Sequence, residues 1–448
     1  MNSLDLTLDP TVDALATEDT AAFDVCVVGL GYIGLPTAAI VAQRSIRVLG
    51  VDIDARVVDA VSCGKIHIEE PGLAERVAHA VGRKMLCVAR VPQPASVFLI
   101  AVPTPFGAGH TPDLKHVRSA ALSIAPVLKR GDLVVLESTC PVGATGQMCE
   151  WLAKARPDLV FPQTGGSALR PDIHVAYCPE RVLPGRTCIE LVRNDRVIGG
   201  MTPHCAQRAE VFYRRFVAGA CALTDARTAE LCKLAENSFR DVNIAFANEL
   251  SMIAAQFDID VWSLIRLANR HPRVNILEPG PGVGGHCIAV DPWFIVDGAP
   301  HAARLIRVAR EVNDDKPQWV LEQVRDAMAR YRPKVGAKVG ARGGTATVRI
   351  AVLGLAFKPD VDDLRESPAV TIAAALMREP DCELRVVEPH IDVLPSGLRG
   401  PNICLLDVNA ALASADLCVV LVKHRAFQSI DPAALSGKPV LDIQGLWQ

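Results

Sequence analysis

The chain has 448 residues, 50% of them hydrophobic and 22% charged, and its formal net charge is −3. This length predicts two or three domains, because a single hydrophobic core rarely serves more than about 250–300 residues. The nearly balanced charge argues against a nucleic-acid-binding or membrane-binding protein, so we expect neither kind of partner. The 14 cysteines include no CxxC pair, which argues against a metal site and favours reduced thiols in the cytoplasm.

The segment before the first strand, residues 1–21, is expected to be a flexible tail. It is acidic and has no Lys or Arg, whereas a signal peptide needs a basic start and an apolar core. The uncharged run "VCVVGLGYIGLPTAAIVA" follows at residues 25–42. It is nearly long enough to span a membrane, but its glycines and its proline favour a buried strand, a turn and a helix.

Residues 22–223 alternate between apolar strand patterns and helical segments, which predicts a parallel α/β sheet. The expected strands are "VCVVGL", "RVLGVDI", "VFLIAV", "LVVLEST", "HVAYCPE" and the short "RVIGG". We expect helices over Pro36–Gln43 and Leu114–Leu128, and another that begins near Pro203.

The first strand runs into "VVGLGYIGLPTAA", in which Gly29, Gly31 and Gly34 have GxGxxG spacing. In a dinucleotide-binding fold the first glycine makes the turn, the second admits the pyrophosphate and the third lets helix and strand pack. Asp52, at the end of the second strand, would bind the adenosine ribose and repel a 2′-phosphate. The pattern predicts a doubly wound, Rossmann-like domain that binds NAD; the alternative is a glycine-rich turn in an ordinary α/β protein.

The stretch Thr224–Gln256 lacks Gly and Pro, which predicts a long helix capped by Thr224 or Asp225. Further helices are expected up to Tyr331, and residues 224–331 would form a central helical domain with a dimer surface. Lys233 and Asn237 are four apart and share a helix face. They could hold and polarise a reacting oxygen; the alternative is a solvated helix face.

The stretch "GPGVGGHCIAVDPW" carries Cys287 behind a cluster of glycines and Asp291 four residues later. A dehydrogenase that oxidises an aldehyde further needs a nucleophile, because the aldehyde must form an adduct before it can donate hydride. A thiolate would give a thiohemiacetal and then a thioester, which water hydrolyses. Cys287 is a candidate for that nucleophile and Asp291 for a nearby acid–base group; the alternative is a core cysteine.

Residues 332–347, "RPKVGAKVGARGGTAT", are basic and glycine-rich, which predicts a linker. Residues 348–448 then resemble a second, smaller α/β domain, in which Glu388 takes the place that Asp52 has in the first. Lys358 and Arg365 follow its first strand. They and the basic group before the cysteine loop, Arg270, His271 and Arg273, suit a diphosphate or a carboxylate; the alternative in each case is a solvated loop.

Taken together, these motifs resemble the UDP-glucose/GDP-mannose dehydrogenase family over nearly the whole chain. The matching stretches occur in order: "GLGYIGLPTA", "AVPTPF", "ESTCPVG", "YCPERVLPG", "KLAENSF", "GPGVGGHCIAVDP" and "GLAFKPDVDDLRESP". The resemblance implies two Rossmann-like domains joined by a long central helix. Cys140 stands where a small hydroxyl or apolar residue is commoner, and we expect little consequence.

The resemblance also implies residue roles. Cys287 would be the thioester-forming nucleophile, Lys233 and Asn237 would stabilise oxyanions, and Asp291, Glu180 and Thr139 would serve the catalytic water and proton transfer. The implied cofactor contacts are Gly29, Gly31, Tyr32, Ile33, Gly34, Asp52, Arg56, Thr104, Thr139 and Arg365. The implied substrate contacts are Glu180, Arg181, Val182, Lys233, Asn237, Gly284, Lys358 and, from a neighbouring subunit, Arg270, His271 and Arg273, so that a homodimer or higher homo-oligomer is expected.

Within the family the likeness is strongest to members that oxidise a UDP-N-acetylhexosamine. It implies that two NAD and water convert UDP-N-acetyl-D-mannosamine to its uronate for polysaccharide biosynthesis. The same chemistry on UDP-N-acetyl-glucosamine, UDP-glucose or GDP-mannose is the alternative. A two-electron hydroxyacid dehydrogenase would leave Cys287 unused, and a non-catalytic nucleotide-sugar sensor would have no need of Lys233, Asn237 and Cys287 together.

Overall fold

The computed structural model describes residues 23–163, 171–285, 287–339 and 347–447. The predicted tail, residues 1–21, lies outside the described residues. The chain divides into two compact units, and the boundary between Ala235 and Glu236 falls inside the long helix α8 (Ala226–Gln256). Each unit contains one sheet, and the two are described separately below.

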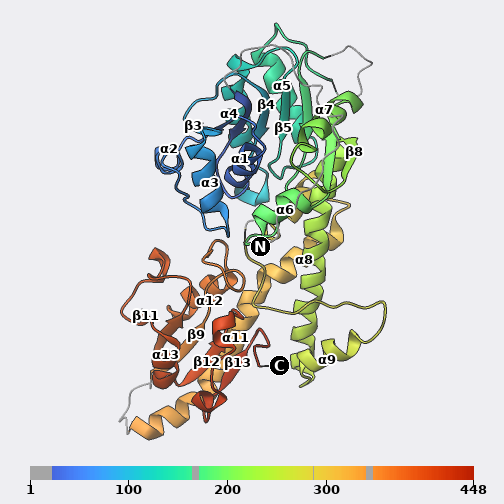
Figure 1. Ribbon diagram of the computed structural model, residues 1–448. Helices are drawn as coiled ribbons and strands as arrows, with labels where there is room; N and C mark the ends of the chain where they lie inside the picture. The colour runs from blue at the N-terminus through green and yellow to red at the C-terminus, as the bar shows by residue number, and fades with distance from the viewer. Residues whose placement is uncertain (1–22, 164–170, 286, 340–346, 448) are drawn as a thin grey trace. The chain divides into compact units, whose positions relative to one another are not determined.

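The sheet of the first unit has the strand order β3-β2-β1-β4-β5-β6-β7-β8 (Figure 1). Its strands are β1 (Phe23–Val28), β2 (Val48–Val51), β3 (Leu86–Ala89), β4 (Ala95–Ile100), β5 (Leu133–Leu136), β6 (His174–Tyr177), β7 (Arg196–Gly200) and β8 (Cys221–Asp225). All neighbours pair in parallel except β6 and β7. The first six strands follow the order of doubly wound dinucleotide-binding folds, so the predicted α/β class is confirmed.

Helices cover both faces of this sheet because the strand residues alternate in direction. Val25 and Val27 of β1 belong to a core that includes α1, α3 and α7, whereas Cys26 and Val28 pack with α4 and α5. The helices are α1 (Gly34–Gln43), α2 (Ala55–Ser62), α3 (Leu73–Gly82), α4 (Lys115–Ile124), α5 (Ala144–Ala155), α6 (Thr187–Arg193) and α7 (Pro203–Tyr213). The run that resembled a membrane span is divided between β1, the glycine turn and α1, as predicted.

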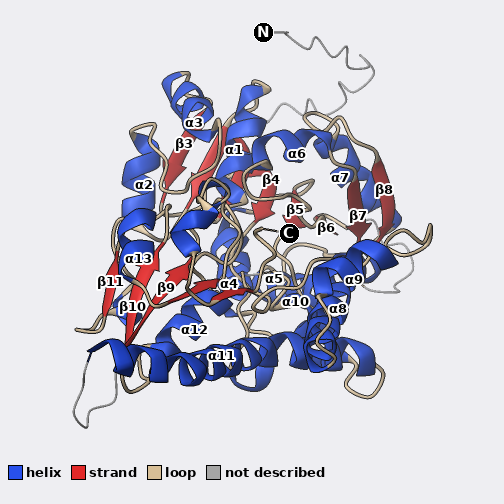
Figure 2. Ribbon diagram, turned by 90° about the horizontal axis from the view of Figure 1, so that it is seen from below, coloured by secondary structure: helices blue, strands red, loops and turns tan. Residues whose placement is uncertain are grey.

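The sheet of the second unit has the order β11-β10-β9-β12-β13, and all its neighbouring strands are parallel. Its strands are β9 (Val348–Leu353), β10 (Cys382–Val387), β11 (Ile403–Leu405), β12 (Leu417–Val420) and β13 (Val440–Asp442). The helices, shown in blue in Figure 2, are the greater part of α8 together with α9 (Val261–Ala268), α10 (Asp291–Gly298), α11 (Arg304–Val339), α12 (Pro368–Leu376) and α13 (Val408–Ser414).

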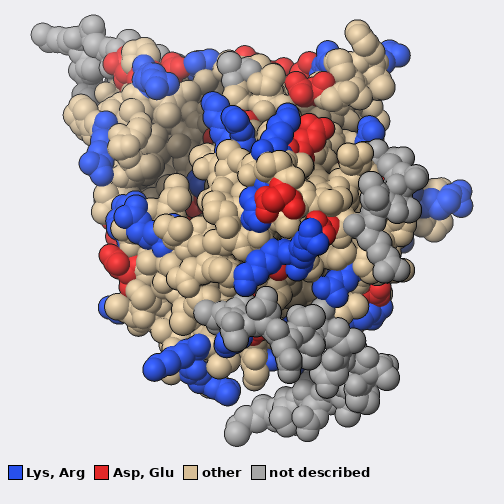
Figure 3. Space-filling model, turned by 90° about the horizontal axis from the view of Figure 1, so that it is seen from above, with Lys and Arg blue, Asp and Glu red and all other residues tan. Residues whose placement is uncertain are grey.

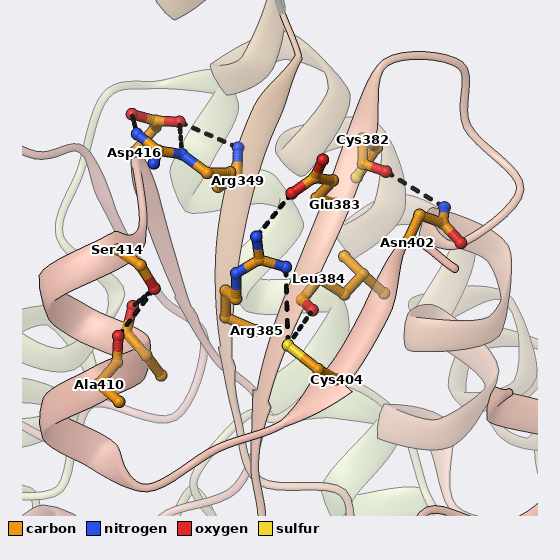
Figure 4. Close-up of polar contacts among 11 residues, drawn as sticks. Arg349, Cys382, Glu383, Leu384, Arg385, Asn402, Cys404, Ala410, Ser414 and Asp416 are labelled. Atoms are coloured by element: carbon orange, nitrogen blue, oxygen red, sulfur yellow. Dashed lines mark hydrogen bonds and ion pairs between the residues drawn. The ribbon is translucent and has the colours of Figure 1, made fainter. Parts of the chain in front are cut away.

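The two faces of the second sheet are also divided by alternation. Ile350 and Val352 of β9 pack with α11 and α12, whereas Ala351 and Leu353 pack with α13. Polar contacts fasten the strands at their margins, as Figure 4 shows: Arg349 meets Asp416 through two hydrogen bonds of 2.9 and 3.0 Å. Such half-exposed pairs contribute about 0–1 kcal/mol, so burial of apolar side chains supplies most of the stability.

The linker prediction is wrong in its first half, because α11 continues through Val339, eight residues into the segment 332–347. A helix that has already formed extends at low cost for each added residue, and the Lys and Ala residues in this run are good helix formers. The helix continues past Pro333 and Gly336, although both residue types are unfavourable in a helix interior. Residues 340–346 lie outside the described part.

The cap prediction for α8 is confirmed at Asp225, whose carboxylate accepts the Thr228 N–H at 3.0 Å.

None of the described helices is long and apolar enough to cross a membrane. On the face seen in Figure 3, basic and acidic side chains are interspersed.

Candidate active site

The glycine turn after β1 has the geometry that a bound pyrophosphate needs. Gly29 has φ +94°, and a Cβ there would collide with the carbonyl of Ala101. A Cβ on Gly34 would overlap the carbonyl oxygen of Gly29. A Cβ on Gly31, in contrast, would have no atom within 4 Å among the described residues other than its chain neighbours. Helix α1 follows without an acidic residue in its first turn. The turn therefore leaves open space where a phosphate could meet the N-terminus of a helix, with Tyr32 and Ile33 between the glycines.

Asp52 is held beside this turn by the backbone. Its carboxylate accepts the N–H of Leu30 at 2.9 Å and the N–H of Asp54 at 2.9 Å. Arg56 is highly exposed and pairs with Asp54 at 2.8 Å, and its hydrogen bonds lower the pKa of the Asp54 carboxyl to about 2. Asp52 is therefore partly accessible after the end of β2. The Arg56 guanidinium is oriented by its ion pair with Asp54.

Thr104 and Thr139 lie close together after the carboxyl ends of β4 and β5. The Thr104 hydroxyl donates to the carbonyl of Thr139 at 2.5 Å, and the Ser138 hydroxyl donates to Val102 at 2.7 Å. These bonds join the two loops that follow neighbouring parallel strands at the edge where open α/β sheets bind ligands.

Glu180 follows β6 at the same edge and is almost fully buried. Its carboxylate forms an ion pair of 2.6 Å with Arg196, which is 2% exposed, and accepts the Arg181 N–H at 2.6 Å. Burial alone would lower the pKa of Arg196, but Glu180 beside it raises that pKa above its usual value. Val182 packs against the core of this unit. Among the three consecutive residues Glu180, Arg181 and Val182, Glu180 has a buried ion-pair partner, Arg196.

Lys233 and Asn237 lie on a buried face of α8, at 9% and 8% exposure. The alternative of a solvated helix face is therefore wrong. A lysine at such burial is costly unless a ligand or a charge accompanies it. In the second unit the Asn237 amide donates a short hydrogen bond to the carboxylate of Asp291, which is buried at the start of α10.

Cys287 lies one turn before α10 and is exposed. Its carbonyl accepts the N–H groups of Val290 and Asp291 at 3.1 and 2.9 Å, so that the residue sits at the positive end of the helix. That position places the residue near the partial positive charge of a helix N-terminus. The alternative of a buried core cysteine is wrong for this residue.

The glycines before Cys287 allow close contact with the loop after β9. A Cβ on Gly284 would meet the carbonyl of Glu366, and one on Gly285, whose φ is +82°, would meet the ring of Phe357. The Gly285 N–H donates to the carbonyl of Arg365 at 3.3 Å. Lys358 and Arg365 thus belong to a loop that touches the cysteine loop, and the Arg365 guanidinium is paired with Asp363 at 2.6 Å.

Arg270, His271 and Arg273 are exposed on a loop after α9. Asn269 closes this loop at its base, because its side chain exchanges hydrogen bonds of 2.9 and 2.7 Å with the backbone of Ile276. The basic group is thus displayed to solvent, as the solvated-loop alternative expected.

The predicted residues fall into two groups, one in each unit. The first unit gathers the glycine turn, Asp52, Thr104, Thr139 and Glu180 at the carboxyl edge of its sheet. The second gathers Asn237, Asp291 and Cys287 beside the loop that carries Lys358 and Arg365. The open space at Gly31 and the acceptor at Asp52 fit a dinucleotide.

One group of possible metal ligands occurs among the described residues: Asp360, His390 and His424. Both ring nitrogens of His424 are already engaged, one by the Asp360 N–H at 3.0 Å and the other by Glu388 at 3.1 Å. We therefore assign no metal to this group.

Three family models match consecutive parts of the chain. The NAD-binding domain of the UDP-glucose/GDP-mannose dehydrogenase family matches residues 23–217, its central domain residues 227–315 and its UDP-binding domain residues 351–448. The chain belongs to this family. It is therefore an NAD-dependent dehydrogenase of nucleotide sugars, and the first unit contains the part that binds NAD.

Named relatives are similar over almost their whole length. A UDP-N-acetyl-D-mannosamine dehydrogenase of Escherichia coli is 56% identical over 95% of this chain and 99% of its own. An NDP-N-acetyl-D-galactosaminuronic acid dehydrogenase of Ralstonia nicotianae is 56% identical over 94% and 96%. The solved structure of a UDP-D-ManNAc dehydrogenase of Pyrococcus horikoshii has a TM-score of 0.81 at 35% identity and covers 95% of this chain and 96% of that one.

Several buried charged residues near these groups were not singled out from the sequence. Besides Arg196, they include Glu137, whose pKa burial raises to about 7 and whose carboxylate accepts the Tyr213 hydroxyl at 2.7 Å. In the second unit, Asp241 and Arg310 form an ion pair of 2.6 Å with neither side chain exposed. One indication of Asp241 was present in the sequence: it follows Asn237 by four residues, which places both on the same face of α8.

Proposed function

We propose that this chain oxidises the primary alcohol of UDP-N-acetyl-D-mannosamine to a carboxylate, with two NAD and one water consumed for each sugar. The observation that carries the proposal is the exposed thiol of Cys287 at the N-terminus of α10, beside the Asn237–Asp291 pair, in a chain with NAD-binding and UDP-binding domains. A thiol so placed can form the adduct through which an aldehyde donates hydride in a four-electron oxidation, and it has no part in a two-electron one.

In the first oxidation the sugar hydroxyl must lose a proton while its carbon loses hydride. Lys233 and Asn237 would hold the oxygen and stabilise the charge that develops on it. The glycine turn and Asp52 would hold NAD, which would supply the hydride acceptor for each of the two oxidations. Further contacts would come from Tyr32, Ile33, Arg56, Thr104, Thr139 and Arg365. The product of this step is an aldehyde.

In the second oxidation the Cys287 thiolate adds to the aldehyde carbon, and the new S–C bond gives a thiohemiacetal. Its C–H bond breaks as hydride leaves, which forms a thioester. Water then attacks the thioester carbon and the C–S bond breaks, so that a carboxylate and the free thiol result. Asp291 would orient or deprotonate the water, and Glu180, with its charge compensated by Arg196, would assist proton transfer near Thr139.

We assign NAD binding to residues 22–223, the nucleophile and oxyanion groups to residues 224–331, and the UDP moiety to residues 348–448. Glu180, Arg181, Val182, Gly284 and Lys358 would contact the nucleotide sugar. The reducing cytoplasm suits the reaction, because the nucleophile must be a free thiol.

A second candidate is the UDP-linked N-acetyl-galactosamine epimer. The Ralstonia relative, named for N-acetyl-D-galactosaminuronic acid, is as similar to this chain as the Escherichia relative. The reaction would be the same, and only the fit of the sugar ring would differ.

We also propose a homodimer in which α8 contributes the interface. Phe239, Phe246 and Ile253 recur at intervals of seven on α8 and are 71%, 57% and 41% exposed. They form an apolar stripe that the described residues leave accessible to solvent. In a dimer the loop with Arg270, His271 and Arg273 would reach the partner's site. Replacing Phe239 and Phe246 by Glu should reduce the mass in light scattering to that of one chain, whereas Val91→Glu, at another exposed apolar position, should not. A dimer that survives the double change would contradict this interface.

The proposed reaction is tested by Cys287→Ser with each UDP-N-acetylhexosamine epimer and UDP-glucose. The wild type should release two NADH per molecule of the mannosamine epimer, and the variant should fall at least about 1,000-fold in rate, because a hydroxyl at its ordinary pKa is a weak nucleophile. A variant that still releases two NADH per sugar at the wild-type rate would overturn the covalent mechanism. Preference for the galactosamine epimer would support the second candidate.

A further inference from the structure

Within the second unit, α8 buries a row of polar side chains on one face and exposes large apolar side chains on the opposite face. Asn237, Asp241, Asn248 and Ser251 recur at helical spacing and are at most 8% exposed. They lie within about 80° of one another on a helical wheel, on the side opposite to the apolar stripe of Phe239, Phe246 and Ile253. Buried polar groups of this kind need hydrogen-bond partners. Following these partners from residue to residue leads from α8 to the backbone of the cysteine loop.

The centre of this face is the ion pair between Asp241 on α8 and Arg310 on α11. Neither side chain is exposed, and their atoms are 2.6 Å apart. Asn313, one turn further along α11, donates to the Asp241 carboxylate at 2.8 Å and to its carbonyl at 3.1 Å. The Asn248 amide in turn donates to the Asn313 side chain at 2.8 Å. The four side chains thus form a continuous buried chain of contacts between two helices.

This chain ends on the cysteine loop at two places. The Asn248 side-chain oxygen accepts the N–H of Gly280, where the loop begins, at 2.8 Å. Arg310 points a guanidinium nitrogen at the carbonyl of Ile288, the residue after Cys287, at 3.5 Å. The cysteine loop is therefore fastened before the thiol to α8, the helix that also carries Asn237, the partner of Asp291. After the thiol it is fastened to Arg310 of α11.

The energetics of the ion pair do not explain its presence as a source of stability. Removing two charges from water costs about as much as their attraction returns, and apolar residues of the same size are often equally stabilising. Burial raises the pKa of Asp241 to about 6 even though Arg310 opposes the shift. One oxygen of Asp241 and the Nε of Arg310 also have no hydrogen-bond partner among the described residues. Our hypothesis is that this costly arrangement is retained because it fixes a geometry.

We propose that Asp241, Arg310, Asn313 and Asn248 are positioning residues that fix the Cys287 thiol relative to the Asn237 side chain of α8. The inference rests on the proposed function in taking Cys287 as the nucleophile. The four residues would act through the backbone at Gly280 and Ile288. Displacement of a reacting group by about 1 Å can lower a rate 100-fold, so the loss should fall on kcat and leave binding intact.

The test compares Arg310→Met, Arg310→Lys and Asn248→Ala with Arg325→Met. The last is a matched control, because Arg325 also lies on α11 and pairs with a carboxylate, Glu379 at 2.6 Å, away from the cysteine loop. Three quantities are measured for each: kcat and KM for NAD and sugar, the rate at which iodoacetamide alkylates Cys287 (followed on its peptide by mass spectrometry), and the melting temperature.

We expect Arg310→Met to lower kcat about 10- to 100-fold with each KM within about twofold, and to change the alkylation rate at Cys287. Arg310→Lys, which keeps the charge toward Asp241, should recover part of kcat, and Arg325→Met should leave kcat, KM and alkylation unchanged. If Arg310→Met does not fold, Asn248→Ala decides, since it removes the anchor at Gly280 without leaving a buried charge.

Wild-type kcat and alkylation in Arg310→Met, or in Asn248→Ala where the first does not fold, would overturn the inference. A fall in the melting temperature with no change at Cys287 would do the same, because it indicates a merely structural role. The alkylation readout does not depend on turnover, so a failure of the proposed function, seen as full activity of Cys287→Ser, is distinguishable from a failure of this inference.

Discussion

The glycine turn of the first unit has a counterpart in the second. Gly29 after β1 and Gly354 after β9 have φ +94° and +93°. In each copy the strand that follows ends in an acid that accepts the N–H of the residue after the glycine: Asp52 from Leu30 at 2.9 Å, and Glu388 from Leu355 at 2.7 Å. The faint sequence repeat is therefore a repeat of structure down to individual hydrogen bonds.

The two acids differ in what else surrounds them. Asp52 is partly accessible. Glu388 is 4% exposed and meets the fully buried ring of His424 at 3.1 Å. Burial alone would raise the pKa of Glu388, but the His424 ring and the backbone N–H groups hold it below its usual value. In the second copy the His424 side chain therefore occupies the position beside the acid. In the first copy the corresponding position beside Asp52 can receive a ribose.

The turns themselves also differ. Helix α1 begins five residues after Gly29, whereas α12 begins 14 residues after Gly354. The longer loop of the second copy carries Lys358 and Arg365 and supports the cysteine loop at Gly284 and Gly285. The same strand–turn–helix arrangement therefore serves two purposes. The short turn after β1 leaves space for a cofactor, whereas the long loop after β9 contacts the cysteine loop and carries basic side chains.

The largest effect is expected at Gly34, which the second copy does not reproduce. Gly34→Ala should prevent folding of the first unit, since the new Cβ would overlap the carbonyl of Gly29 and backbone cannot move aside cheaply. Gly31→Ala is the matched control: it should keep the melting temperature but raise KM for NAD at least about tenfold, because its methyl group would occupy the space for the pyrophosphate. Normal NAD binding in Gly31→Ala would contradict the assignment of the turn.

A smaller effect separates the two acids. Asp52→Ala should raise KM for NAD about 10- to 100-fold, as expected for a lost hydrogen bond to a charged group, and should improve the use of NADP. Glu388→Ala should leave KM for NAD unchanged and lower the melting temperature, because His424 would lose its buried partner. The comparison fails if both variants change NAD binding equally.

The smallest effect concerns buried cations. Arg196 in the first unit has Glu180 as a partner, whereas Lys316 in the second is 1% exposed and meets only the Ser251 hydroxyl at 2.6 Å and the Trp319 ring among the described groups. Burial lowers the pKa of Lys316 to about 7. The unfolded chain therefore binds one more proton than the folded chain between about pH 7 and 10.5, so this lysine makes stability rise with pH in that window.

Denaturation of Lys316→Met at pH 7 and pH 9 measures this contribution. The variant should be more stable than the wild type at pH 7, and the difference should shrink by roughly 1 kcal/mol per pH unit as the pH rises. Comparing the two proteins cancels the titration of the cysteines, which both contain. A difference that does not depend on pH would show that Lys316 is charged in the folded chain.

Much of the fold was predictable because its signals are local. The strands β1, β2, β4, β5, β6 and β7, the glycine turn and the cap at Asp225 each depend on a few consecutive residues. The missed strands β3, β8 and β11 are short, and β8 is half exposed, so that hydrophobic patterning is weak there. The end of α11 was missed because glycine-rich composition does not reveal the low cost of extending a helix that has already formed.

The site was predictable only as far as its motifs reach. Cys287, Asn237 and Asp291 were found because they lie in recognisable stretches, and the structure brings them together. Arg196, Asp241 and Arg310 were not, because their roles depend on burial against segments far away in the chain. In a helix such as α8, a carboxylate four residues after an amide is equally compatible with a solvated face and with a buried polar face. The sequence alone does not distinguish the two.

The most direct test of the account is to stop turnover in acid within milliseconds and to weigh the peptide that contains Cys287. With UDP-N-acetyl-D-mannosamine and NAD, the account predicts a transient acyl adduct on that sulfur, which disappears as the second NADH and the uronate form. Uronate that accumulates with two NADH per sugar while Cys287 remains unmodified at every time point would contradict it.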